Sequence, residues 1–76
     1  MNYARASIVC DIVAELTGQP RDRVTPDSLL DDLDVTVIEN VGITLELERV
    51  FSVSISDDAA EAAVTVRDFI NGVRPA

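Results

Sequence analysis

Histidine is absent from the 76-residue sequence, and cysteine occurs once, at Cys10. A disulfide framework needs a second cysteine and a structural zinc site draws on cysteine and histidine, so both ways of stabilising a small fold are excluded. The start of the sequence shows no basic segment followed by an apolar one, and no apolar run approaches the ~20 residues that span a bilayer. We therefore expect a protein of the reducing cytoplasm, without the membrane as a partner.

Aromatic residues are also scarce, since only Tyr3, Phe51 and Phe69 are present. A chain of this length buries only about 60% of the surface that its unfolded form exposes. Hydrophobic residues nevertheless make up 47% of the sequence, which is too much for a disordered segment. We expect a single domain over residues 1–76, with a core of Val, Ile, Leu and Ala.

Basic residues are few, with six arginines against fourteen acids and a net charge of −8. Between residues 27 and 61 the only cation is Arg49, whereas that window holds ten acids. The ten are Asp27, Asp31, Asp32, Asp34, Glu39, Glu46, Glu48, Asp57, Asp58 and Glu61. Such a field repels nucleic acid and anionic lipid and steers the molecule toward a basic protein. The alternative is that these acids only keep a small protein soluble.

Catalytic and metal-binding patterns fail when they are tested. Asp31 and Asp32 are adjacent, with no partner nearby to separate their pKa values into an acid and a base. A calcium loop that started at Asp32 would need glycine at its sixth position and glutamate at its twelfth, but Val37 and Ile43 stand there. We expect no catalytic residue, no metal site and no enzyme activity.

Hydrophobic spacing predicts a first helix over residues 4–16 that ends before Gly18 and Pro20. Its expected buried face is Ile8, Val9, Ile12, Val13 and Leu16. A long loop follows over residues 19–33, and loops of this length are uncommon in small domains. We expect the loop to be fastened to the core by Val24, Leu29, Leu30 and Leu33.

A capping box formed by Thr36 and Glu39 predicts a second helix that runs to about Phe51. We expect Ile38, Val41 and Leu45 to face inward and Glu39, Glu46 and Glu48 to face water. Gly42 costs the helix about 1 kcal/mol relative to alanine. Either another element packs closely against Gly42, or the helix tolerates the loss. The sequence does not decide whether Gly42 marks a dimer contact, a hinge or neither.

Two further helices complete an all-α bundle of three main helices and one short one. After an extended connector, Ser56 is placed to cap the short helix, which we expect to run through Ala63. Thr65 and Asp68 repeat the Thr-x-x-acid pattern at the start of the last helix, which Arg74 and Pro75 end. Its expected inward residues are Val66, Phe69, Ile70 and Val73.

This order, together with several short motifs, resembles the acyl carrier protein and peptidyl carrier protein family. Residues 24–27 (Val-Thr-Pro-Asp), followed by Asp32-Leu33, look like the loop of that family. Residues 46–51 resemble the acidic end of its second helix, and residues 65–70 its last helix. The register needs no gap from Asp32 to Val73. The resemblance implies a four-helix carrier fold.

The departure from the family lies at its working residue. Carrier proteins present Gly-x-Asp-Ser-Leu at the start of the second helix, and the serine receives the phosphopantetheine arm. In the register of the resemblance these positions are residues 34–38, and the serine position is Val37. Because valine has no hydroxyl, we expect no phosphopantetheine cofactor. The alternative is a working carrier armed at Thr36, whose oxygen is expected in the cap instead.

The resemblance also implies a docking face for a basic patch on an acyl-processing or biosynthetic enzyme. Its expected residues are Glu39, Leu45, Glu48, Asp57, Asp58 and Glu61. Gly42 and Arg49 stand where the family often has acids, so the face is thinned. We predict an interaction protein that is monomeric and carries no phosphopantetheine arm.

A second alternative is a non-covalent binder of an apolar ligand. Cys10 is expected to be a buried, structural thiol.

Overall fold

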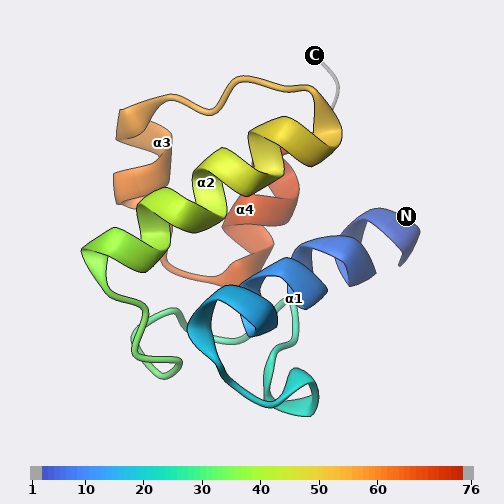
Figure 1. Ribbon diagram of the computed structural model, residues 1–76, viewed down its shortest axis with the longest axis vertical. Coiled ribbons are helices and arrows are strands. Elements are labelled where there is room, and N and C mark those ends of the chain that lie inside the picture. The colour runs from blue at the N-terminus through green and yellow to red at the C-terminus, as the bar shows by residue number, and fades with distance from the viewer. Residues whose placement is uncertain (1–2, 75–76) are drawn as a thin grey trace.

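The computed structural model describes residues 3–74, apart from the side chain of Tyr3, and within this range the chain is helical with no strand. Helix α1 spans Tyr3–Thr17, and a 3₁₀ turn, η1, spans Arg21–Arg23. Helix α2 spans Val37–Phe51, α3 spans Asp57–Ala62 and α4 spans Val66–Gly72 (Figure 1). The predicted all-α bundle with one short helix is confirmed. The predicted end at Pro75 lies outside the described residues.

The core lies where α1 packs against α2 and α4. From α1 it takes Val9 and Val13, and from α2 Ile43 and Leu47, all fully buried. The four residues predicted to face inward from α4 are all buried: Val66, Phe69, Ile70 and Val73. Aliphatic side chains thus make most of the core, as the scarcity of aromatic residues requires.

The boundaries of the helices follow the predicted signals closely. Gly18 has φ +72°, a left-handed conformation that glycine adopts without strain, and α1 ends directly before it. At the start of α3 the Ser56 hydroxyl accepts a hydrogen bond from the Ala59 amide at 3.1 Å. A Cβ on Gly42 would meet nothing within 4 Å, so no other part of the described chain packs closely there.

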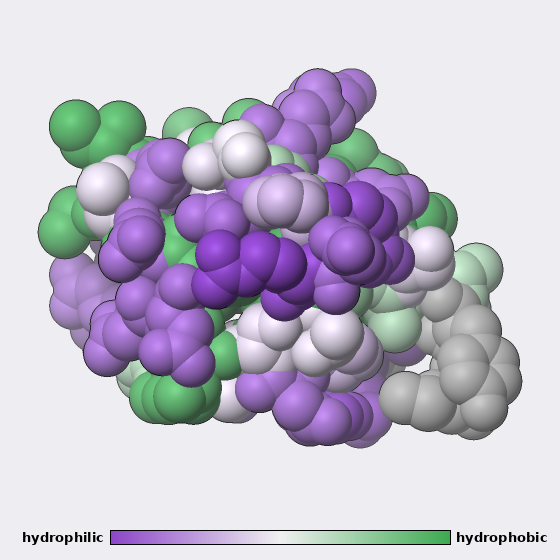
Figure 2. Space-filling model, turned by 90° about the horizontal axis from the view of Figure 1, so that it is seen from below, coloured by the Kyte–Doolittle hydropathy of each residue, from purple (hydrophilic) through white to green (hydrophobic). Residues whose placement is uncertain are grey.

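The long loop is held by the start of α4, which the sequence did not reveal. The Leu30 amide donates to the Val64 carbonyl at 2.9 Å, and the Val66 amide donates to the Ser28 carbonyl at 3.1 Å. These bonds flank an isolated antiparallel bridge between Leu29 and Thr65. From the side of this loop the surface is mostly hydrophilic, with hydrophobic residues toward its edges (Figure 2).

Three residues expected in the core are instead partly exposed. Ile8 and Leu16 lie at the edge of the buried face of α1, and Leu29 lies in the loop, each about two-fifths exposed. The remaining loop anchors, Val24, Leu30 and Leu33, are buried as predicted. The backbone of Leu29 is used for the bridge to Thr65, and the buried side chain beside it is that of Leu30.

The prediction for the buried face of α2 was wrong. Ile38, Val41 and Leu45 are 84%, 53% and 60% exposed, whereas Ile43, Thr44 and Leu47 are buried. At about 100° per residue, the three exposed side chains lie about 160° to 220° around the helix from Ile43. Two apolar stripes therefore run along α2 on opposite sides, and only one of them can face α1.

Candidate functional site

The N-terminus of α2 is closed by the predicted capping box. The Glu39 amide donates to the Thr36 hydroxyl oxygen at 3.1 Å, and the Thr36 amide donates to the Glu39 carboxylate at 3.0 Å. The cap confirms the predicted helix start and places Val37 and Ile38 in the first turn. Their side chains are 82% and 84% exposed. This end of the helix thus presents two aliphatic groups to solvent.

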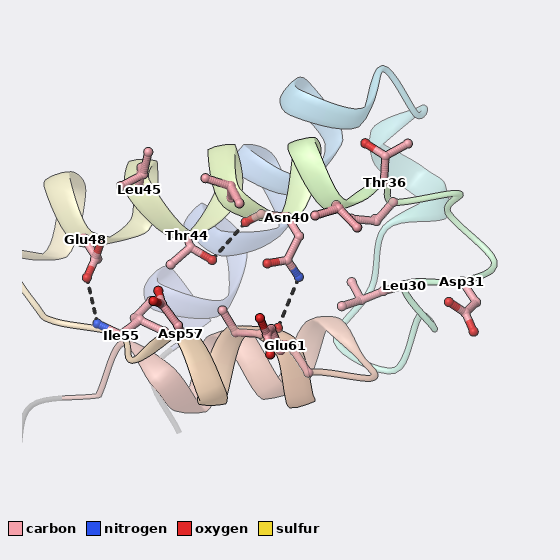
Figure 3. Close-up of a pocket in the computed structure, with 15 residues that line it drawn as sticks. Leu30, Asp31, Thr36, Asn40, Thr44, Leu45, Glu48, Ile55, Asp57 and Glu61 are labelled. Atoms are coloured by element: carbon pink, nitrogen blue, oxygen red, sulfur yellow. Dashed lines mark hydrogen bonds between the residues drawn. The ribbon is translucent and has the colours of Figure 1, made fainter.

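A groove of about 610 Å³ lies between α2, α3 and the end of the long loop. Its α2 wall consists of residues three or four positions apart, namely Val37, Asn40, Val41, Thr44, Leu45 and Glu48. This spacing places them on one face of a helix. The opposite side includes Ile55, Asp57, Ala60, Glu61 and Ala63, and the loop adds Leu30 and Asp31. Figure 3 shows Asn40, Thr44 and Glu48 directed from α2 toward this opposite side.

Side chains of α2 tie the opposite side of the groove in place (Figure 3). The Asn40 amide donates to the Ala60 carbonyl of α3 at 3.2 Å. The Glu48 carboxylate accepts a hydrogen bond from the Ile55 amide at 2.8 Å, just before α3. The Thr44 hydroxyl donates back to the Asn40 carbonyl at 2.9 Å. The Asn40, Thr44 and Glu48 side chains are therefore engaged with the backbone.

Charge in the groove is of one sign. Asp31, Glu48, Asp57 and Glu61 line it, and no arginine lines it within the described residues. The nearest cation in sequence, Arg49, pairs with Glu46 on the same helix. In the absence of a local cation, an apolar wall beside these carboxylates favours a ligand that is both apolar and positively charged.

The structure brings four of the six predicted docking residues to the groove: Leu45, Glu48, Asp57 and Glu61. Asp58 is exposed on the same short helix but does not line the groove. Glu39 does not line the groove either. Glu39 and Glu48, expected both to face water and to take part in docking, are half-buried and accept backbone hydrogen bonds. Sequence reasoning missed Val41 as a surface residue, although its angular separation from Ile43 was a usable signal.

The remaining reactive group is excluded from the site. Cys10 is 2% exposed in the core of the bundle, as predicted, and burial raises the pKa of its thiol. A protonated, inaccessible thiol is a poor nucleophile.

Residues 3–74 contain no group of three or more His, Cys, Asp or Glu side chains that could hold a metal ion. Over the same residues, no helix is both long enough and apolar enough to cross a bilayer.

Comparison with known proteins agrees with this fold. Residues 7–73 match the family described as "Phosphopantetheine attachment site". The chain is also 41% identical over 63 residues to a protein named "Acyl carrier protein" from Beutenbergia cavernae, covering 82% of this chain and 77% of that protein. This chain therefore belongs to the acyl carrier and peptidyl carrier protein family, whose members are carrier proteins and not enzymes.

Proposed function

We propose that the protein is a carrier-fold interaction domain that docks onto an acyl-processing or biosynthetic enzyme and carries no phosphopantetheine arm. The observation that supports this most directly is Val37, the first residue of α2, which is 82% exposed and has no hydroxyl. In the register of the family motif this is the position of the modified serine.

The residues at the start of α2 do not fit the arm that members of the family carry. Attachment forms a phosphodiester and needs a hydroxyl at an exposed position. The only hydroxyl beside Val37 is that of Thr36, which accepts the hydrogen bond of the Glu39 amide. Modification there would disturb a cap that contributes about 1 kcal/mol to the helix.

The proposed partner is a cytoplasmic enzyme with a basic docking patch. Asp57, Asp58 and Glu61 of α3 are exposed and make no ion pair within the described residues. Glu48 of α2 lines the groove beside Asp57 and Glu61 and accepts a hydrogen bond from the Ile55 amide, whereas Glu39 accepts one from the Thr36 amide at the start of the helix. The full chain carries a net charge of −8, so neither nucleic acid nor a second copy of the chain is an attractive partner.

Incubation with a broad-specificity phosphopantetheinyl transferase and coenzyme A tests the proposal, with intact-mass measurement as the readout. We expect no gain in mass for the unaltered chain. A gain would support the alternative carrier armed at Thr36, provided that Thr36→Asn abolishes it. Asparagine is the matched control because it caps a helix as well as threonine does but has no hydroxyl.

Val37→Ser provides the complementary measurement. Because position 37 is highly exposed at a well-capped helix start, we expect the serine variant to gain one phosphopantetheine group. Such a gain would mean that the surroundings still suit the family's modifying enzyme and that only the nucleophile is missing. If the variant stays unmodified, the partner is not one of the enzymes that recognise carriers with an attached phosphopantetheine arm.

The groove supports a second candidate, the non-covalent binding of an apolar ligand. Its volume of about 610 Å³ is within the range of small-molecule sites, and Leu30, Ile55 and Ala60 give it apolar lining. Titration with decanoic acid, followed by amide chemical shifts, tests this candidate. Saturable shifts confined to the groove would support it.

A further inference from the structure

We propose that the protein has a second interaction surface, where α1 packs against the C-terminal half of α2, and that this surface binds a mostly apolar helix of another protein (Figure 1). This α1–α2 surface is a hollow of about 300 Å³ lined by Ile8, Ile12, Glu15 and Leu16 of α1 and by Arg49 and Val50 of α2. The helix that it binds belongs to a partner additional to the enzyme of the proposed function. The inference does not depend on whether the chain carries an arm.

The apolar part of the α1–α2 surface comes from both helices. Ile8, Ile12 and Leu16 stand at i, i+4 and i+8 on α1, and such residues form a ridge about 12 Å long. Ile12 is buried, whereas Ile8, Leu16 and Val50 are each about two-fifths exposed. Their own fold thus covers these three side chains only in part, although all of them line one hollow. Apolar groups gathered in this way typically mark a surface for another protein.

The charges around the hollow select the occupant. Asp11 and Glu46 also line it, but each is already neutralised within the chain. The Asp11 carboxylate pairs with Arg21, and the Glu46 carboxylate pairs with Arg49. Glu15 is exposed and makes no hydrogen bond or ion pair within the described part of the chain. The surface therefore lacks a single cation, which one lysine or arginine of an otherwise apolar segment would supply.

Other occupants fit the α1–α2 surface less well. Its volume of about 300 Å³ is at the lower limit for small-molecule sites, so a few side chains of a helix fill it better than a whole ligand. A fatty acid would bring its carboxylate next to Glu15, and a second copy of the chain would bring a net charge of −8. A helix with aliphatic residues three or four positions apart matches the ridge of α1.

The α1–α2 surface is separate from the groove between α2 and α3. The two have no lining residue in common. At about 100° per residue, Glu46, Arg49 and Val50 lie on average about 160° around α2 from the residues of that helix that line the groove. A partner bound at one surface therefore leaves the other accessible. Together with the proposed docking at the groove, this arrangement lets the domain link two proteins.

The test uses a peptide of about 18 residues, long enough to form a helix, with leucine at every third or fourth position, one central lysine and otherwise alanine and glutamine. A second peptide has glutamate in place of the lysine. Each is titrated into the full chain, with amide chemical shifts as the readout. We expect the lysine peptide to shift residues 8–16 and Val50 and to leave Asp57 unchanged. Leu16→Gln should weaken binding about five-fold, whereas Ile38→Gln, an equal change outside this surface, should alter it less than two-fold.

Charge is tested with Glu15→Lys and its matched control Glu61→Lys, which change the net charge equally. Both glutamates are exposed, so neither change disturbs the core. Glu15→Lys should weaken binding of the lysine peptide about five-fold and strengthen binding of the glutamate peptide to a similar extent. Glu61→Lys should alter the binding of either peptide less than two-fold. Circular dichroism of each variant verifies that the fold is kept.

Several results would overturn the inference. Equal losses for Leu16→Gln and Ile38→Gln, shifts centred on α3, or no saturable shift up to about 1 mM peptide would each contradict it. Equal binding of the two peptides would do the same, as would an equal change of preference in Glu61→Lys. Tighter binding of decanoic acid at the α1–α2 surface, or self-association through Val50, would show a different occupant and contradict it too. None of these results concerns phosphopantetheine, so the mass measurement separately decides the proposed function.

Discussion

Two helices of this molecule begin with the same Thr-Val-x-acid pattern. Their comparison shows which structural features of a helix start depend on the local sequence. Thr36-Val37 with Glu39 begins α2, and Thr65-Val66 with Asp68 begins α4. Both helices start at the valine, as the pattern predicts. Yet Val37 is 82% exposed and Val66 is fully buried. The cap therefore sets where a helix starts, and tertiary packing sets what the first turn contacts.

The reason for the difference lies in the long loop. Its backbone pairs with the start of α4 through Ser28 and Leu30, so that Val66 is enclosed. At the start of α2 the chain arrives through Asp34, whose φ is +55°, and no described segment covers the first turn. The position that we propose as the family's attachment site, Val37, is thus exposed by the fold itself.

The largest expected effect contrasts the two valines directly. Val66→Ser leaves a cavity and buries a hydroxyl in the core, which we expect to lower the free energy of unfolding by about 3 kcal/mol. Val37→Ser alters an exposed side chain and should change it by less than about 0.5 kcal/mol. Urea denaturation followed by circular dichroism measures both. Similar losses for the two variants would contradict the packing described for the two helix starts.

A smaller effect is expected at the cap of α2. Thr36→Ala removes the acceptor of the Glu39 amide hydrogen and should cost about 1 kcal/mol, whereas Thr36→Asn should restore most of the loss. Urea denaturation again provides the measurement. If the alanine variant were as stable as the unaltered chain, the Thr36 hydroxyl would not be engaged in the cap, and the case against its modification would weaken.

The smallest effect concerns the acid at the start of α4. The Asp68 carboxylate accepts hydrogen bonds from the Val64 and Thr65 amides, which lower its pKa below the ordinary value of 3.8. The carboxylate therefore stabilises the fold above the unfolded-state pKa, and this contribution is lost as the pH falls through the folded-state pKa. Asp68→Asn should make stability less dependent on pH below about pH 4. An unchanged pH profile would contradict the role of these bonds.

The sequence predicted the four helices well because caps and breakers act locally. Thr36 with Glu39, Ser56 and Gly18 each sit at the expected boundary. It did not predict which stripe of α2 is buried, since Ile43 with Leu47 and Ile38 with Val41 and Leu45 are equally periodic. The choice depends on where α1 lies, which is information from outside the helix.

The candidate site was predicted only in part, for the same reason. The acids of α3 and Glu48 were found from their clustering, because charge density is readable along the chain. Val41 was missed as a surface residue, and the roles of Glu39 and Glu48 in holding the backbone depend on contacts that the helix spacing does not reveal. The proposal that Val37 holds the family's attachment position rests on the register of the family motif alone.

The intact mass of the unaltered chain, after incubation with a broad-specificity phosphopantetheinyl transferase and coenzyme A, tests the central claim most directly. A known carrier protein in the same tube shows that the transferase is active. We expect the carrier control to gain one phosphopantetheine group while the mass of this chain stays the same. A gain of one group by the unaltered chain would contradict it.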